Sequence, residues 1–171
     1  MRRVVIAILA LAIAAPATCA AAPGGHALKR YVMRVQGQIG TYRKLLHRVE
    51  ALVAEEEHVN VDPVVDQFNE LSDKFEDLAA RWQAVNAPHG LRLRHRGMGR
   101  VFVLFADAYR IHAAALFTRH TDEILAARPK VEAKLRSAAY LQQRWAAALQ
   151  GALIRAKLRV PGWLHRMAIG R

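Results

Sequence analysis

The chain contains 171 residues, 53% of them hydrophobic, and its 26 lysines and arginines against 14 acids give a formal net charge of +12. This length fits a single domain with a sizeable core. The only cysteine, Cys19, excludes an intrachain disulfide and a Cys-x-x-Cys-His site for covalent haem.

Residues 1–22 have the pattern of a secretory signal peptide. Two arginines follow the first methionine, residues 4–15 are apolar, and a proline then introduces a stretch of small residues. The apolar run is about twelve residues long, whereas a helix that spans a bilayer needs ~20. We therefore expect cleavage after Ala20 or Ala21. The product would be an exported protein, periplasmic or secreted, with one helical-bundle domain over residues 21–171.

A second interpretation of this leader is a lipoprotein, in which Cys19 becomes a lipidated N-terminus. The preceding residues, Pro16-Ala17-Thr18, lack the leucine of the usual lipobox. The leader therefore favours simple cleavage over a lipid anchor. Cleavage would leave the mature chain without a thiol for catalysis or metal binding.

The mature chain shows helical periodicity and no strand alternation. Apolar residues in its first segment recur at alternating steps of four and three, the heptad pattern of a helix seam. That seam comprises Leu28, Val32, Val35, Ile39, Tyr42, Leu46, Val49 and Val53, with Tyr31, Leu45 and Leu52 on one flank. Similar spacing recurs three more times, and it predicts helices over residues 27–58, 63–86, 91–127 and 129–159.

Local signals set the boundaries of these helices. Asp62 and Pro63 provide an N-cap and a first helical residue for the second helix, and Pro129 is expected to open the fourth. Between Thr118 and Arg128 the third seam degrades, so we expect a bend or a break there. Four long amphipathic helices with short connections predict an all-α, up-down-up-down antiparallel four-helix bundle.

Charge is distributed unevenly along the chain. Residues 50–77 hold ten of the fourteen acids and one lysine, whereas residues 81–171 hold seventeen lysines and arginines against four acids. Outer stripes opposite the apolar seams indicate solvated faces, or a partner-binding surface with acidic and basic sides. These stripes are Asp66, Glu70, Asp73 and Asp77 on the second helix and Arg30, Arg34, Lys44 and Arg48 on the first.

The densest basic cluster lies at the start of the third predicted helix and comprises Arg92, Arg94, His95, Arg96 and Arg100. Cations there oppose the helix dipole, and a bound anion would offset that cost because helix amides and arginines converge on it. The cluster therefore predicts an anion-binding site for an acidic polymer, an anionic lipid surface or an envelope protein. The alternative is an ordinary arginine-rich loop. Nucleic acid is disfavoured because no aromatic residues are interleaved with the cations.

The central part of the third predicted helix, residues 101–117, is apolar apart from Asp107, Arg110 and His112. Asp107 and Arg110 are three residues apart and can pair on one helix face, and His112 falls on the seam. These residues predict a buried polar cluster, the kind of place where chemistry is found. The alternative is an ion pair at the edge of the core beside a structural histidine.

The fourth predicted helix has apolar residues on two faces. Opposite its seam lie Tyr140, Ala147, Ile154 and Leu158. A helix that is apolar on two faces must bury both. We expect the tail of residues 160–171, around Trp163, to fold back over the second face. A second copy of the chain in a homodimer, a partner protein and a lipid surface are the alternatives.

The sequence predicts no metal site, cofactor or catalytic constellation. One Glu-x-x-His occurs at residues 55–58, whereas a di-iron bundle needs two, and a non-covalent haem held by Met33 and His112 is an alternative. We therefore expect a binding or structural module of the cell envelope or extracellular space and not an enzyme. A bundle that binds a small ligand or haem is the second hypothesis, and an exported enzyme is the third.

Overall fold

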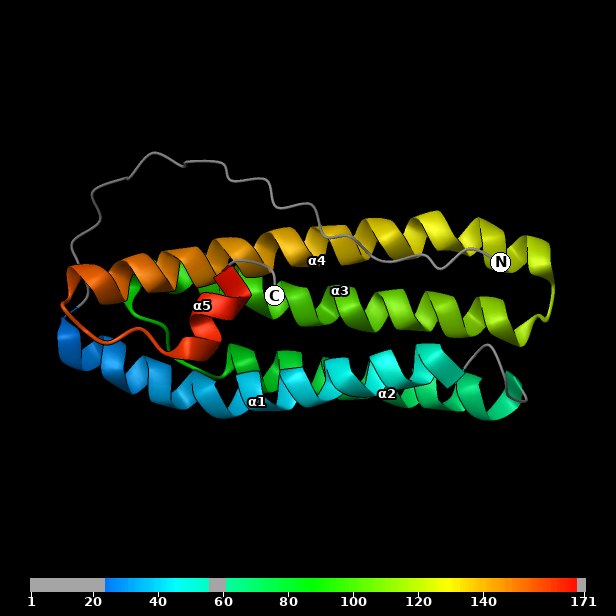
Figure 1. Cartoon of the computed structure of the whole chain (residues 1–171), viewed down its shortest axis with the longest axis horizontal. Coiled ribbons are helices and arrows are strands. Elements are labelled where there is room, and N and C mark those ends of the chain that lie inside the picture. Colours follow the sequence, from blue (N-terminus) through cyan, green and yellow to red (C-terminus); the bar gives the residue numbers. More distant parts are fainter. Residues whose placement is uncertain (1–23, 56–60, 169–171) are drawn as a thin grey trace.

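The computed structural model describes residues 24–55 and 61–168, and in this part the secondary structure is helical, which confirms the prediction of an all-α protein. The elements are α1 (Gly25–Glu55), α2 (Val61–Gln83), the 3₁₀ turn η1 (His89–Leu91), α3 (Arg92–Phe117), α4 (Thr121–Arg155) and α5 (Gly162–Ala168). The long helices α1 to α4 lie side by side, with successive helices running in opposite directions (Figure 1). The predicted signal peptide lies outside the described residues.

Helix α3 lies in the middle of the helix array. It packs along α2 on one side and along α4 on the other, whereas α1 packs mainly on α2 and also reaches α4. The short helix α5 folds back against α4 (Figure 1). The sparse polar content of residues 101–117 suits this central position, because a helix with neighbours on several sides has little surface left for water.

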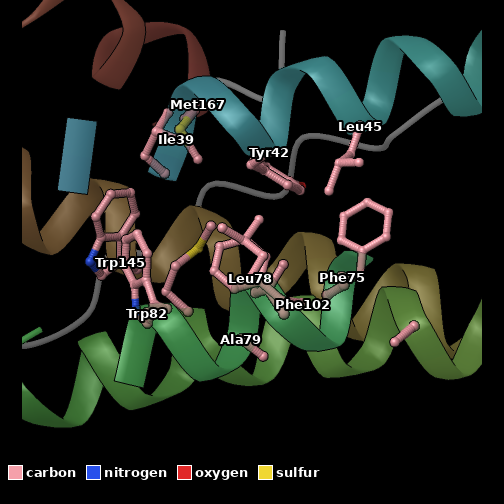
Figure 2. Packing of buried hydrophobic residues seen from close by; sticks show 14 of the residues in the cluster. Ile39, Tyr42, Leu45, Phe75, Leu78, Ala79, Trp82, Phe102, Trp145 and Met167 are labelled. Carbon is pink, nitrogen blue, oxygen red and sulfur yellow. The ribbon is translucent and has the colours of Figure 1, made fainter. Parts of the chain in front are cut away.

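Aromatic side chains fill the space between the helices. Tyr42 contacts Phe102 edge-on with ring centroids 5.3 Å apart, and Trp82 meets Trp145 in the same way at 5.3 Å (Figure 2). These rings come from all four long helices, and each is almost completely buried. Such edge-to-face pairs each add about 0.5–1.5 kcal/mol beyond the area they bury.

The apolar seam of α1 drifts along the helix. Val35, Ile39 and Tyr42 are buried as predicted, but further along Leu52 is buried at 2% exposure while Val53 is 50% exposed. The prediction for Val53 was wrong because it took the wrong flank of the stripe as the seam. Toward the end of α1 the buried flank is the one that carries Tyr31, Leu45 and Leu52, which keep the seven-residue spacing.

The boundary between the third and fourth helices was predicted too late. The break predicted between Thr118 and Arg128 does occur, at the start of that interval, Thr118–His120, where Arg119 adopts a left-handed φ of 57°. Helix α4 begins at Thr121 with two acids in its first turn, which favour a helix N-terminus through the dipole. Pro129 therefore lies inside α4 and does not open it. The proline is exposed, so the carbonyl that loses its donor can be hydrated.

Helix α4 ends at Arg155, before the predicted limit of 159. Lys157 adopts a left-handed φ of 54°, and the Leu158 amide donates to the Leu153 carbonyl at 2.9 Å. This is the hydrogen-bond pattern of a Schellman cap. The cap turns the chain back toward the bundle, and in α5 Leu164 and Met167 are buried while Trp163 stacks on Trp145.

Candidate anion-binding surface

The predicted arginine cluster lies on the first turns of α3, but its members do not share one environment. Arg92, Arg96 and Arg100 are exposed and Arg94 is half-buried, whereas His95 is only 5% exposed. The first turn of α3 contains no acid, and no side chain caps it. The arginines therefore remain candidates for anion binding, and the assignment of His95 to this site was wrong.

His95 belongs to a buried hydrogen-bond network that joins four helices. Its Nδ1 lies 2.9 Å from the Tyr31 hydroxyl of α1, and its Nε2 lies 3.0 Å from the Trp82 carbonyl oxygen of α2. Trp145 of α4 donates its indole N–H to the Tyr31 oxygen at 3.0 Å, and Trp82 donates its own to the His95 carbonyl at 2.9 Å. Each polar atom in this chain of contacts has a partner.

The partners in this network assign the tautomer of His95. A carbonyl can only accept, so Nε2 carries the proton and donates to Trp82. The Tyr31 hydroxyl then donates to Nδ1 and accepts from Trp145. Burial lowers the pKa of His95, opposed by its hydrogen bond to the Trp82 backbone, and burial also raises the pKa of the Tyr31 hydroxyl. Both groups are therefore neutral at pH 7.

The sequence contained a signal for this burial. His95 precedes Met98, Phe102 and Phe105 at steps of three, four and three residues, so it extends the apolar seam of α3 by one turn. The flanking arginines obscured that signal, because a histidine among four arginines resembles a surface residue. Its partner Tyr31 lies 64 residues away in sequence, and Trp145, which bonds to Tyr31, lies 114 residues from that tyrosine, so no local pattern could connect them.

Lysine and arginine dominate one half of the molecule. We define the basic half as residues 24–44, 78–106 and 135–168, which together hold sixteen lysines and arginines and no aspartate or glutamate. It contains the start of α1, the end of α2, the start of α3, the end of α4 and all of α5, which meet at one end of the bundle (Figure 1). Within the described residues, none of these sixteen cations forms an ion pair with a carboxylate.

The opposite half, residues 45–77 and 107–134, carries all fourteen acids of the sequence and seven lysines and arginines. Here opposite charges form ion pairs: Glu70 binds both Arg48 and Lys74, and Asp62 binds Arg119 at 2.6 Å. The hydrogen bond from Arg48, together with that from Lys74, lowers the pKa of Glu70 to about 2. The outer stripes of α1 and α2 were predicted to be solvated faces or a partner-binding surface, but at Arg48 and Glu70 they form an ion pair with each other.

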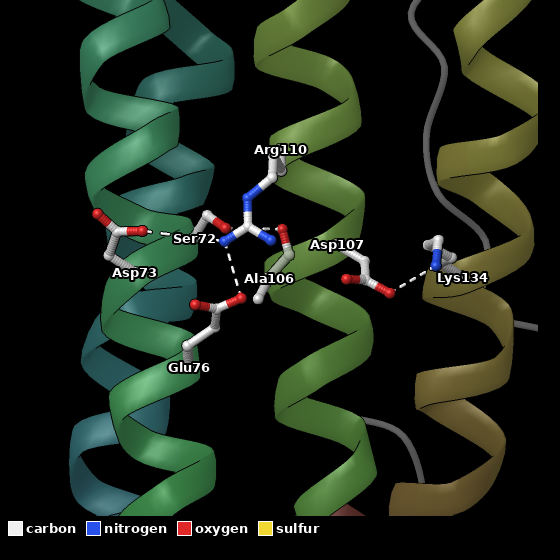
Figure 3. Close-up of polar contacts among 7 residues, drawn as sticks. All are labelled: Ser72, Asp73, Glu76, Ala106, Asp107, Arg110 and Lys134. Carbon is white, nitrogen blue, oxygen red and sulfur yellow. Dashed lines mark hydrogen bonds and ion pairs between the residues drawn. The ribbon is translucent and has the colours of Figure 1, made fainter.

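Asp107 and Arg110 do not pair with each other, although their spacing on α3 allows it. Arg110 points to α2, where it binds Glu76 at 2.8 Å, and Asp107 points to α4, where it accepts from Lys134 at 2.6 Å (Figure 3). Both ion pairs are one-third to one-half exposed. His112 packs edge-on against Phe68 with ring centroids 4.8 Å apart. The predicted buried cluster is therefore two ion pairs at the edges of the core and a separate histidine.

A shallow groove follows the outer side of α3 in the basic half. Its apolar floor includes Leu104 and Leu141, and arginines Arg96, Arg100 and Arg144 line it. Gly97 also lines it, and an added Cβ there would be 3.8 Å from the Leu141 side chain, an ordinary van der Waals contact. Asp107 and Lys134 of the opposite half line the same groove.

The second apolar face of α4 is not covered by the tail. Tyr140 is 51% exposed, Ile154 is 59% exposed and Ala147 is also exposed, while Leu158 alone is half-buried. The tail forms α5 as expected, but its buried residues pack against the core side of α4. The prediction of self-covering was therefore wrong for three of the four residues, which leaves this face open to another molecule.

Residues 24–55 and 61–168 contain no group of three or more histidines and acids that could hold a metal ion. Met33 is 66% exposed and lies in the basic half, whereas His112 lies in the opposite half, so this pair cannot ligate one haem. Among the same residues, no helix is both long and apolar enough to cross a bilayer.

In comparisons with protein-family models, curated proteins and solved structures, nothing matches this chain.

Proposed function

We propose that this protein is an exported four-helix bundle, closed by the short helix α5, that binds a polyanionic component of the cell envelope or extracellular space through its basic half. One observation carries the proposal: sixteen cations gather at one end of the fold with no carboxylate among them. Charged residues on a protein surface usually form ion pairs with charges of opposite sign or alternate with them, as they do in the opposite half.

This segregation has an electrostatic cost that a binding partner would offset. Charges within a Debye length of about 8 Å at physiological ionic strength interact appreciably, so neighbouring arginines on the first turns of α3 repel one another and also oppose the helix dipole. A polyanion converts this repulsion into attraction, and it also attracts the protein from a distance.

Salt elution from a heparin column tests the proposal. The triple variant Arg92→Gln, Arg96→Gln, Arg100→Gln removes three exposed cations from the basic half. A matched control, Arg119→Gln, Arg128→Gln, Lys130→Gln, removes three exposed cations from the opposite half.

The first variant is expected to elute at clearly lower salt than the wild type, and the control close to it. Equal elution of both variants would mean that only net charge matters, which contradicts a localised binding surface. Failure of the wild-type protein to bind would refute the proposal as a whole.

The proposed export rests on the pattern of residues 1–22. N-terminal sequencing of the mature protein is expected to give Ala21 or Ala22 as the first residue. A lipid-blocked Cys19 would instead make the protein a lipoprotein, which would hold the basic half near a membrane by a covalent anchor.

A small-ligand or haem-binding bundle is the second proposal and receives less support. The interior positions that a cofactor would need are occupied by aromatic rings such as Tyr42, Trp82 and Trp145. A visible absorption spectrum of the purified protein separates the two proposals, because bound haem gives a strong Soret band. No observation favours the third hypothesis, an exported enzyme.

A further inference from the structure

We infer that the polyanion is the surface of an anionic lipid bilayer, on which the outer sides of α3 and α4 lie flat in the basic half. This inference rests on the proposed function and names its partner. The docking face is defined by Leu93, Arg96 and Arg100 on α3 and by Tyr140, Arg144 and Ile154 on α4.

The docking face combines exposed apolar side chains with cations. Leu93 is 70% exposed, Ile154 is 59% exposed and Tyr140 is 51% exposed. Surface leucines and isoleucines are ordinary when single, but these lie among cations, and the carboxylate that lines the adjoining groove, Asp107, is paired with Lys134. A purely ionic partner such as an acidic polysaccharide would not bury these apolar side chains, whereas a bilayer can bury them below the level of its phosphates.

Arg144 connects the two helices into one surface. It lines the groove beside Arg100 on α3, and it donates to the Tyr140 hydroxyl at 2.8 Å while lying 5.3 Å from the centre of the tyrosine ring. From Tyr140 the apolar stripe continues along α4 at seven-residue intervals through Ala147 to Ile154. The groove and the stripe therefore form one continuous face.

The chemistry of this face matches the interface of a bilayer. Tyrosine is enriched at the level of the headgroups, arginine can extend its charge to phosphate while its stem stays in apolar surroundings, and helices of this mixed character lie in the plane of the interface. Each cation near an anionic leaflet strengthens binding by about five-fold, so several together give useful affinity while the apolar residues add the part that salt does not remove.

Sedimentation with vesicles tests the inference in the mature, full-length protein. The probes are vesicles of phosphatidylglycerol and phosphatidylcholine, and vesicles of phosphatidylcholine alone. A charge variant, Arg96→Gln, Arg100→Gln, Arg144→Gln, removes three cations from the docking face. An apolar variant, Leu93→Ser, Tyr140→Ser, Ile154→Ser, removes three side chains that are each more than half exposed.

The opposite half of the molecule supplies a matched apolar control. Val53→Ser, Phe117→Ser, Leu125→Ser changes three side chains with comparable exposure, between 50% and 72%. All variants are checked by far-UV circular dichroism and thermal melting. Their side chains lie outside the core, so the fold is expected to persist.

The wild type is expected to bind the anionic vesicles and not the neutral ones. The charge variant should bind on the order of 100-fold more weakly. The apolar variant should bind vesicles at least ten-fold more weakly while keeping its elution from heparin, and the matched control should behave as the wild type.

The outcomes separate this inference from the proposed function. If the apolar variant binds vesicles as tightly as the wild type, or if the wild type binds heparin but not anionic vesicles, lipid docking is refuted while polyanion binding stands. If the wild type binds neither heparin nor anionic vesicles, both are refuted.

Discussion

Removal of the Tyr31 hydroxyl is the most direct test of the buried network. In Tyr31→Phe the ring stays in place, but the indole N–H of Trp145 loses its acceptor and Nδ1 of His95 loses its donor. Both atoms belong to buried residues. A buried polar group without a partner costs about 1–3 kcal/mol, so the two together should lower the free energy of unfolding by about 2–6 kcal/mol.

Tyr140→Phe is the matched control, because it makes the same chemical change at a hydroxyl on an exposed side chain that contacts only Arg144 among the described residues. Surface changes of this kind stay within about 0.5 kcal/mol. Urea unfolding at pH 7.5, followed by circular dichroism, measures both. With a slope of about 2 kcal/mol/M for a domain of this size, the Tyr31→Phe midpoint should fall by about 1–3 M.

The slopes of the two unfolding curves should agree with that of the wild type, since neither change alters the area exposed on unfolding. A Tyr31→Phe variant as stable as Tyr140→Phe would refute the reasoning. It would mean that the hydrogen bonds of the network contribute no more to the free energy of unfolding than the hydration of the same groups in the unfolded chain.

Two further predictions concern the core. Burial lowers the pKa of His95 in the folded state, so below the ordinary pKa of about 6.5 the unfolded chain binds more protons than the folded one. The free energy of unfolding should therefore fall as the pH decreases from about 6.5 to the folded-state pKa. The fall is at most about 1.4 kcal/mol per pH unit. In His95→Gln this contribution is absent, and the difference in unfolding free energy from the wild type should shrink between pH 7.5 and pH 5; a constant difference would contradict the assignment. Leu164→Ala in α5 removes a fully buried side chain and should cost about 2–5 kcal/mol, whereas Ile154→Ala should cost less than about 0.5 kcal/mol; equal small losses in thermal and urea unfolding would mean that α5 does not belong to the core.

The fold class followed from local information. Helical periodicity depends on which side of a helix meets the core, and that side can be read along the chain without knowing the partner. The prediction was therefore right for buried positions such as Val35 and Tyr42. It was wrong at Val53, where the neighbouring helices decide which flank of a broad apolar stripe is buried, and at Pro129, which was taken for a helix start although an exposed helix turn tolerates it.

The environments of the candidate site residues depended on contacts between distant parts of the chain. Asp107 and Arg110 are neighbours on α3, yet each forms an ion pair with a different helix, because an opposite charge on α2 faces Arg110 and one on α4 faces Asp107. His95 looked like part of a basic cluster, and only the approach of Tyr31 and Trp82 makes it a buried neutral group.

The basic half likewise depends partly on the sequence and partly on the tertiary structure. The sequence by itself determined that acids concentrate in residues 50–77 and that arginines prevail after residue 81. Only the tertiary structure decided that the cations of α1 join those of α3, α4 and α5 at one end, because antiparallel packing brings the start of one helix beside the end of the next. Coulomb interactions depend on distance in space, and the fold sets that distance.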